Sequence, residues 1–458
     1  MKTKKSSFIT SVGERISYGL YFVGQNVFYM LIFLFLLPFF TDVGISPAAV
    51  GGITLIVKIW DAINDPIFGG IVDKVKFKKG KFLPWLKISL IAIPLSTILL
   101  FALPSTIHIS IKIIWAIVSY ILWDTAYTLC DVPIFGIVTT MTDVQEERTF
   151  MMVIGRIAAG VAAIAVMAIL PGVREKMGGW LPIVIIFSVF GLFSMLPICI
   201  KAKERIKTHT QEGDVGLKEM FRFLKGNKYM LIYYAFVFIY SSTAINQGLR
   251  IYLARHCFGN EGVMGLISLA RFLPGIILGI FIPIICKKID KFHLLFTAIL
   301  TGALLDIVSY FIGFQNFSLF MIMLVIRSIP YGIVTVLLFM FTPDCLEYGL
   351  YKTGISAPGI SFSIQTFSIK LTSAISTTVG AFALAAIGFV EGENAVQKTG
   401  FGSKFWMVYI LVPAIGALCS LFLFRKYKLR DKDVKVMTKC NNGEISREEA
   451  EIQLGEKY

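Results

Sequence analysis

Apolar residues run through this chain in a series of long blocks, separated by shorter polar or charged stretches. Most blocks are about 20 residues or longer, the length that a helix needs to cross the hydrocarbon core of a bilayer. The pattern predicts twelve transmembrane helices at residues 17–41, 47–72, 82–104, 111–139, 150–170, 180–200, 229–254, 262–286, 294–313, 317–342, 356–389 and 402–424. The sequence therefore predicts an all-α membrane protein.

The longest polar stretch divides these helices into two sets of six. We predict an N-terminal six-helix bundle over residues 1–200, a linker loop over 201–228, a second bundle over 229–424 and a tail over 425–458. Two sets of six helices are typical of secondary transporters, which bind their substrate near the bilayer midplane between two repeats. The expected fold is therefore a pair of six-helix bundles around a central cavity.

Composition supports this class and excludes others. Of the 458 residues, 56% are hydrophobic and only 16% are charged, against about 25% charged in a soluble domain. The net charge is +15, and the Lys and Arg residues gather in connecting stretches such as 74–81 and 201–228. Basic loops mark the cytoplasmic side of membrane proteins. We expect a multi-pass protein of the cell (inner) membrane with both termini in the cytoplasm, and no binding of nucleic acid.

Catalytic and metal-binding patterns are not found in the sequence. The seven cysteines are scattered without ligand spacing, and neither a phosphate-binding loop nor an HExxH motif occurs. No nucleophile and base stand in a recognisable arrangement. The chain is therefore predicted not to be an enzyme and to use no cofactor, beyond a possible coupling ion such as Na⁺ or H⁺.

Ionisable residues inside the predicted helices are the main candidates for function. A charge at the centre of a membrane helix costs about 2.5–3.5 kcal/mol on insertion scales, so such residues usually face a cavity or a partner. The first half contains Lys58, Asp61, Asp65, Asp124, Asp131 and Arg156, which sum to −2. The second half contains Arg250, Arg271, Asp306, Arg327 and Lys370, which sum to +3. These opposite excesses are consistent with a polar cavity between the two halves.

The segment "KIWDAINDP" at residues 58–66 is the most specific of these patterns. Asp61 and Asp65 are four residues apart and share one face of a helix, with Lys58 on the same side. In the fourth predicted helix, Thr128 lies between Asp124 and Asp131. Carboxylates with a hydroxyl or amide oxygen can bind a small cation or carry a proton. The alternative is a set of structural salt bridges, with Lys58 on one aspartate and Arg156 on another.

Several segments of the sequence resemble those of a known family. The segments "YGLYFVGQN", "IWDAINDPIFGGIVD", "ILWDTAYTLCDVPIFGIV", "ERTFMMVIGR" and "SIQTFSIK" are similar to those of the glycoside–pentoside–hexuronide:cation symporters. The similarity is to the melibiose-carrier type within the major facilitator superfamily, and it covers all twelve predicted helices in order. The resemblance implies a transporter that couples sugar uptake to a monovalent cation by alternating access.

The resemblance also implies roles for individual residues. Asp61, Asp65, Asn64 and Thr128 match the family's cation ligands. Asp131 and Arg156 match the acid and base that bind sugar hydroxyls, and Tyr127 and Phe135 match aromatic positions near the sugar. Gln365, Thr366 and Lys370 match a polar helix of the second half that lines the same cavity.

Three departures from the melibiose type bear on the substrate. Gln25 and Asn26, which we also place at the substrate, replace a lysine–aspartate pair, and Thr335 replaces a tryptophan. Arg250, Arg271 and Arg327 are positive where the melibiose type is uncharged. These arginines are possible anion-binding residues, which would favour an acidic sugar such as a hexuronide. Alternatively, they pair with Asp306, with Asp124 or with helix C-termini.

The predicted function is therefore cation-coupled sugar symport. A uniporter or exchanger of the same fold, in which the aspartates only form salt bridges, is the alternative within the transporter class. A sensor or scaffold of transporter ancestry is a second alternative, disfavoured because the charges of the cavity are retained. The same carboxylates would serve Na⁺, H⁺ or Li⁺, so the residues leave the coupling ion open.

Overall fold

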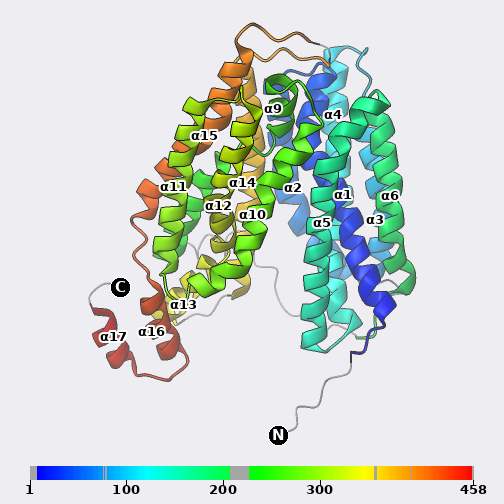
Figure 1. Cartoon of the computed structure of the whole chain (residues 1–458). Coiled ribbons are helices and arrows are strands. Elements are labelled where there is room, and N and C mark those ends of the chain that lie inside the picture. The colour runs from blue at the N-terminus through cyan, green and yellow to red at the C-terminus, as the bar shows by residue number, and fades with distance from the viewer. Residues whose placement is uncertain are drawn as a thin grey trace. The chain divides into compact units, whose positions relative to one another are not determined.

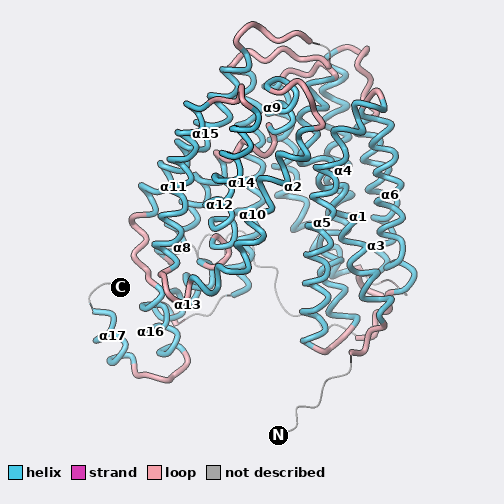
Figure 2. The backbone as a smooth tube through the Cα atoms, in the orientation of Figure 1, coloured by secondary structure: helices cyan, strands magenta, loops and turns pink. Residues whose placement is uncertain are grey.

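The computed structural model describes residues 8–75, 77, 80–206, 226–354, 358–393 and 395–455. Within these ranges the chain forms α-helices joined by loops (Figures 1 and 2), and an isolated bridge joins Phe77 to Gly80. Residues 207–225, which make up most of the predicted linker, lie outside the described residues, so the predicted division of the chain there stays a prediction.

The chain falls into two compact units. The first comprises Met1–Asp214, Arg250–Leu266 and Leu384–Thr399, and the second comprises Val215–Leu249, Ile267–Ala383 and Gly400–Tyr458. Helices of the first unit are α1 (Val12–Asp42), α2 (Pro47–Lys74), α3 (Leu83–Phe101), α4 (Ile109–Met141), α5 (Gln145–Met177), α6 (Trp180–Lys201) and α9 (Arg250–Cys257). Helices that lie wholly or mostly in the second unit are α8 (Lys228–Ser242), α10 (Val263–Ile285), α11 (Lys291–Ile312), α12 (Phe317–Leu337), α13 (Phe341–Thr353), α14 (Pro358–Ala386), α15 (Phe401–Phe424), α16 (Asp431–Asn441) and α17 (Arg447–Leu454).

Each of the twelve predicted spans coincides with a helix or a pair of helices. Nine helices within the described ranges are long and apolar enough to cross a membrane. The span predicted at 229–254 is not one helix, because the chain turns between α8 and α9. Two serines and Thr243 end α8 there, and the Thr243 hydroxyl donates to the carbonyl oxygens of Ile239 and Tyr240. Such local side-chain bonds compete with helix continuation, and hydropathy alone does not register them.

Helix α1 is the central helix of the first unit, where it packs against α5 and α6. Its start at Val12 is set by a capping box, in which Ser11 accepts from the backbone of Glu14 and Glu14 accepts from that of Ser11. The contact with α6 depends on small residues. A Cβ added at Gly24 would lie 2.5 Å from the carbonyl oxygen of Gly191, so the backbones can approach this closely only without a side chain.

The second unit is built on a cluster of aromatic rings. The rings of Phe292 and Phe424 lie 4.9 Å apart between centroids, and those of Phe424 and Tyr427 lie 5.3 Å apart. The tail is part of this unit, because α16 packs on α13 and buries Val434 and Met437. The tail thus continues the core of the second unit, beyond the last membrane-spanning helix.

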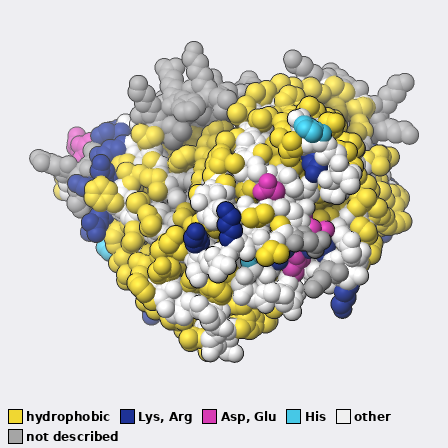
Figure 3. Space-filling view, turned by 90° about the horizontal axis from the view of Figure 1, so that it is seen from above, with side chains coloured by type: hydrophobic (Ala, Val, Ile, Leu, Met, Phe, Trp, Pro, Cys, Tyr) yellow, Lys and Arg dark blue, Asp and Glu magenta, His cyan; other side chains and the backbone are white. Residues whose placement is uncertain are grey.

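Large apolar side chains also cover the outside of the helices. Phe311 and Phe422 are 79% and 72% exposed, which would be costly in water but is favourable against lipid. Figure 3 looks onto one end of the helices, and apolar side chains form much of its rim while charged side chains are few. This surface confirms a multi-pass membrane protein.

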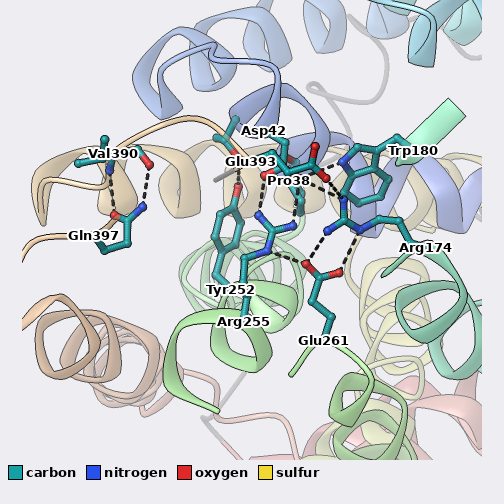
Figure 4. Close-up of polar contacts among 11 residues, drawn as sticks. Pro38, Asp42, Arg174, Trp180, Tyr252, Arg255, Glu261, Val390, Glu393 and Gln397 are labelled. Atoms are coloured by element: carbon teal, nitrogen blue, oxygen red, sulfur yellow. Dashed lines mark hydrogen bonds and ion pairs between the residues drawn. The ribbon is translucent and has the colours of Figure 1, made fainter. Parts of the chain in front are cut away.

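The end of the first unit at which α1 finishes contains a cluster of charges that we call the Asp42 network (Figure 4). Its members are Asp42, Arg174, Trp180, Arg255, Glu261 and Glu393. Arg255 donates to the two oxygens of Asp42 at 2.5 and 3.0 Å. Arg174 donates to the two oxygens of Glu261 at 2.6 and 3.0 Å. Bidentate pairs of this kind are geometrically specific, and breaking a buried one is costly.

The Asp42 network joins parts of the chain that are far apart in sequence. Arg255 Nε also donates to Glu261 Oε1 at 2.7 Å, and Trp180 Nε1 donates to Asp42 Oδ2 at 2.9 Å. The backbone N–H of Glu393 donates to the carbonyl oxygen of Asp42 at 3.1 Å. Helix α9 and the segment before α15 are therefore fixed to the end of α1, although their neighbours in the sequence belong to the second unit.

We predict that Asp42→Asn destabilises the protein, because it removes the carboxylate that Arg255 faces and weakens the position of Arg174. Breaking a buried ion pair costs about 3–5 kcal/mol. The apparent melting temperature in detergent should fall by several degrees. Glu451→Gln is the control, because its pair with Arg447 is 62% and 60% exposed and contributes little. Equal melting temperatures for the two variants would contradict a stabilising role for the network.

The pH dependence of this stabilisation follows from Glu261. Burial alone would raise the pKa of this carboxyl, but Arg174 and Arg255 hold it below the ordinary value of 4.5. The stabilisation is therefore fully present above that value and is lost as the pH falls through the lowered pKa. The difference in melting temperature between the native protein and Glu261→Gln should be constant from neutral pH down to that value, and should shrink below it.

Candidate functional site

A polar group at the contact between α2 and α4 contains the predicted cation ligands. Asp61 and Asp65 are one turn apart on α2, where Asp61 is buried and Asp65 is half-buried. The Lys58 ammonium lies 3.1 Å from Asp61 Oδ2 and 3.8 Å from Asp124 Oδ1 of α4. Lys58 therefore bridges carboxylates from two helices, which is one half of the salt-bridge alternative.

Asn64 and Thr128 connect the same two helices on the side of Asp65. Asn64 Nδ2 donates to Thr128 Oγ1 at 2.9 Å. The Thr128 hydroxyl lies 3.3 Å from Asp65 Oδ1 and 3.1 Å from the carbonyl oxygen of Asp124, and its proton can serve either acceptor. The structure thus brings together the predicted cation ligands Asp61, Asp65, Asn64 and Thr128.

This group, which we call the α2–α4 cluster, is rich in oxygen atoms that can bind a cation. Asp61, Asp65 and Asp124 contribute three carboxylates, Lys58 contributes one ammonium, and an amide and a hydroxyl lie beside them. Among the described residues no three His, Cys, Asp or Glu side chains converge closely enough to hold a metal ion by themselves. A cation bound here would therefore need the amide and hydroxyl oxygens as well as the carboxylates.

A second polar surface lies on α4, next to the α2–α4 cluster. Tyr127, Asp131 and Phe135 follow at intervals of four residues and therefore share a helix face. Asp131 is half-buried and its Oδ1 accepts from Gln25 Nε2 of α1 at 3.3 Å. The ring of Tyr127 stacks on that of Trp123, with centroids 5.1 Å apart. One carboxylate between two aromatic rings can hydrogen-bond to sugar hydroxyls while the rings contact the apolar sugar face.

Arg156 reaches the same surface from α5. Its guanidinium carbon lies 5.6 Å from the centroid of Phe135, within cation–π range. The side chain is exposed and makes no ion pair with any residue that the structure describes. Arg156 is therefore not the structural partner of an aspartate, as the second half of the salt-bridge alternative required.

The two amides that replace a lysine–aspartate pair differ from each other. Gln25 is 2% exposed, and its carbonyl oxygen Oε1 has no hydrogen-bond partner among the described residues. Asn26 is half-buried, and its Nδ2 donates to the carbonyl oxygen of Phe22 in its own helix at 3.0 Å. Of the two, Gln25 is placed against Asp131, whereas the Asn26 amide is bonded to the backbone of α1.

The predicted residues of the second half lie on α14. Gln365 and Lys370 are half-buried and Thr366 is exposed, with Thr366 and Lys370 one turn apart. This spacing gives one polar face to an otherwise apolar helix. That this face shares a cavity with the residues of α4 stays a prediction.

The three arginines proposed for anion binding belong to different units. Arg250 belongs to the first unit, where it is 3% exposed and its Nη1 lies 3.6 Å from Met167 Sδ. Arg271 and Arg327 belong to the second unit. Arg327 Nε lies 2.6 Å from Asp306 Oδ1, so the alternative of pairing with Asp306 holds for Arg327. It does not hold for Arg271, which instead lies over the ring of Tyr331.

Sequence reasoning missed two partners at these clusters. The pairing of Lys58 with Asp124 joins two helices, so no spacing within one helix could indicate it. Tyr331 was not singled out, although its position four residues after Arg327 places both on one face of α12. A tyrosine at such a position is ordinarily packing, and only the three-dimensional contact with Asp306 distinguishes it.

Comparison with known proteins identifies the class of molecule. The MFS/sugar transport protein family matches residues 17–431. The isoprimeverose transporter of Lactiplantibacillus pentosus is 26% identical, with 93% of this chain and 90% of that protein covered. The glucuronide carrier protein homolog of Escherichia coli (strain K12) is 24% identical, with 92% and 93% covered. Both similarities extend over nearly the whole chain.

Solved structures agree on the fold. The crystal structure of the nucleoside transporter NupG superimposes with a TM-score of 0.64 at 16% identity, covering 91% of this chain and 100% of that one. At this identity the likeness concerns the fold alone. The prediction of an all-α membrane transporter rather than an enzyme is confirmed, and so is the resemblance drawn from the sequence motifs. This chain belongs to the MFS/sugar transport protein family, as a transporter of the glycoside–pentoside–hexuronide:cation symporter type.

Proposed function

We propose that this protein imports a sugar or glycoside together with a monovalent cation, Na⁺ or H⁺, by alternating access. The observation that carries the coupling is the set of carboxylate, amide and hydroxyl oxygens that the α2–α4 cluster brings to one helix contact. Oxygens of these kinds are ligands for a small cation, and a carboxylate can instead take up a proton. A bound cation would order α2 against α4 and so favour the neighbouring sugar surface on α4.

The sugar surface is adjacent to the cation ligands along one helix. Thr128 of the cluster and Asp131 of the sugar surface are three residues apart on α4, so a cation held by Thr128 fixes the turn that carries Asp131. The buried carbonyl oxygen of Gln25 is an acceptor without a described partner. A sugar hydroxyl could satisfy it, which would offset the cost of a buried unsatisfied group. In this proposal Asp131, Arg156 and Gln25 bind the sugar.

The charge of the second unit supports an acidic sugar as the substrate. Arg271 and Arg327 contribute two positive charges and Asp306 contributes one negative charge, which leaves an excess of +1. A carboxylate or sulfonate on the sugar would offset it. One relative is named as a glucuronide carrier homolog, while another is named as a transporter of the neutral sugar isoprimeverose, so similarity alone does not decide.

The orientation of the protein in the membrane rests on the distribution of charge along the sequence. We place the protein in the cell (inner) membrane with both termini in the cytoplasm, because the basic stretches fall on the side of the termini. A uniporter or exchanger of the same fold is the second candidate, and the observation that favours it is the Lys58–Asp61 ion pair. In that candidate Lys58 offsets part of the cluster's charge permanently and no external cation enters.

The proposal predicts uptake that depends on both the cation and the charge of the sugar. Membrane vesicles containing the protein are given a panel of matched acidic and neutral glycosides, with and without an inward gradient of Na⁺ or H⁺. Accumulation above the external concentration should occur only with one of the two gradients, and acidic glycosides should be preferred. Equilibration without accumulation under both gradients would establish the uniporter instead.

Asp65→Asn is the sharpest single change at the cation site, because it leaves the Lys58–Asp61 pair in place. We expect this variant to lose cation-driven accumulation and to retain exchange of internal for external sugar. Asp143→Asn, in the exposed turn before α5, is the matched control for loss of one carboxylate. Normal accumulation by Asp65→Asn at equal membrane abundance would show that Asp65 is not a coupling residue.

Asp131→Asn and Arg156→Lys test the sugar surface. A charge-assisted hydrogen bond in a site shielded from water contributes about 1.5–3 kcal/mol, so either change should weaken sugar affinity about tenfold or more. The cation concentration for half-maximal stimulation, measured in the same vesicles, serves as the internal control and should change far less. Unchanged sugar affinity in both variants would place the sugar elsewhere.

A further inference from the structure

In the second unit, α11 and α12 bring an arginine and a tyrosine to one aspartate, and α10 adds a second arginine beside that tyrosine. Asp306 of α11 is completely buried, and Arg327 of α12 is 4% exposed. Arg327 Nε lies 2.6 Å from Asp306 Oδ1, and the Tyr331 hydroxyl donates to Asp306 Oδ2. Both oxygens of the carboxylate are therefore occupied. Arg327 and Tyr331, one turn apart on α12, bind Asp306 from the same side.

Arg271 of α10 is the arginine that remains outside this arrangement. Its guanidinium carbon lies 4.2 Å from the centroid of the Tyr331 ring, which is a close cation–π contact. Arg271 makes no ion pair with any residue in the described ranges. Its side chain is half-buried, whereas that of Arg327 is buried. The positive excess of the group therefore belongs to Arg271.

Burial decreases in one direction along this face of α12. Arg327 is buried, Tyr331 is half-buried, and Thr335, one turn further along α12, is exposed. An arginine that faced lipid at this depth would be strongly disfavoured. Tyr331 therefore lies between the buried pair and the exposed part of this face, with Arg271 over its ring.

We propose that Tyr331 determines the charge preference of the transporter, by keeping Arg271 available for the acidic group of the substrate. The Tyr331 hydroxyl donates to Oδ2 of Asp306 while Arg327 pairs with Oδ1, and Arg271 forms no ion pair among the described residues. The Tyr331 ring also packs against the Arg271 guanidinium. Arg271 then binds a carboxylate or sulfonate of the sugar through two N–H groups, while Arg327 has a structural role.

This inference rests on the proposed acidic substrate and adds a residue that sets it. Arg271 and Arg327 look equivalent in the sequence, but an anion would have to displace different groups to reach them. An anion that reached Arg327 would have to displace Asp306 from a sealed pair, whereas an anion at Arg271 displaces water alone. Arg271 is accordingly the residue that contacts the substrate, and Tyr331 is a positioning residue that acts through Asp306 and Arg271.

The test compares two probes that differ only in charge, methyl β-D-glucuronide and methyl β-D-glucoside. Their affinities for the purified full-length protein are measured by isothermal titration calorimetry in detergent, at fixed NaCl and pH. The quantity of interest is the ratio of the two affinities within each protein sample. That ratio is insensitive to the fraction of folded protein, so partial misfolding of a variant does not obscure the result.

Tyr331→Phe is the decisive variant, because it keeps the ring beneath Arg271 and removes only the hydroxyl. Asp306 Oδ2 then becomes available to Arg271, and the preference for the glucuronide should fall about tenfold, the loss of one charge-assisted hydrogen bond. Arg271→Gln should lower it by a similar factor, with glucoside affinity little changed. Tyr310→Phe is the matched control: Tyr310 lies one turn from Asp306 on α11, and its hydroxyl bonds to no described residue.

The outcomes separate this inference from the proposed function. If the native protein prefers the glucuronide and Tyr331→Phe retains that preference, the role of Tyr331 is wrong while acidic-sugar transport stands. If Arg271→Gln also retains it, the anion binds elsewhere. If the native protein binds both probes equally, the acidic substrate itself is wrong and the inference fails with it. Loss of preference in both variants, with Tyr310→Phe unchanged, supports the inference.

Discussion

The cost of an uncompensated charge inside a membrane protein determines most of what this molecule can do. Each ionisable side chain in a spanning helix must face water, a partner or a ligand, because the hydrocarbon offers no solvation. Asp306 and Arg327 meet this constraint with a sealed pair. Lys58 meets it by bridging Asp61 and Asp124. Asp65 and Arg271, which these two pairings do not include, are the candidates for contact with a transported cation and anion.

The ionisable groups of the two units differ in kind and in structural basis. In the first unit the α2–α4 cluster has three carboxylates to one ammonium, and the oxygens of Asn64 and Thr128 lie beside them. In the second unit the carboxylate of Asp306 pairs with one of two guanidiniums and accepts from a tyrosine hydroxyl, and the other guanidinium lies over the ring of that tyrosine. The first arrangement is suited to a small cation, and the second to a single anionic group.

Sequence patterns predicted the membrane helices well, because their signal is local. A block of about 20 apolar residues has few alternatives to a spanning helix, and each of the twelve predicted blocks is helical. The break between α8 and α9 was missed, since hydropathy gives the extent of an apolar stretch but not the turns within it. Asp61, Lys58 and Asp65 could be placed on one face from their spacing, for the same local reason.

Contacts between helices could not be predicted in this way. The spacing of residues says which side chains share a face but not which helix that face meets. Lys58 with Asp124, Gln25 with Asp131, and Tyr331 with Asp306 all join different helices. The Asp42 network is the extreme case, because its charges are separated by more than 200 positions in the chain. These pairings also decide which arginine is structural and which is available, which sequence alone left open.

A symporter is defined by coupling between its sugar and its cation. This coupling is reciprocal by thermodynamic necessity, because each ligand changes the affinity for the other by the same factor. The most direct measurement therefore reverses the usual assay. De-energised vesicles containing the protein receive an inward sugar gradient without any cation gradient, and the external Na⁺ concentration and pH are followed with electrodes. Symport predicts that sugar entry removes Na⁺ or protons from the medium, and that Asp65→Asn abolishes this movement while sugar still crosses. Sugar entry with no movement of either cation in the native protein would contradict it.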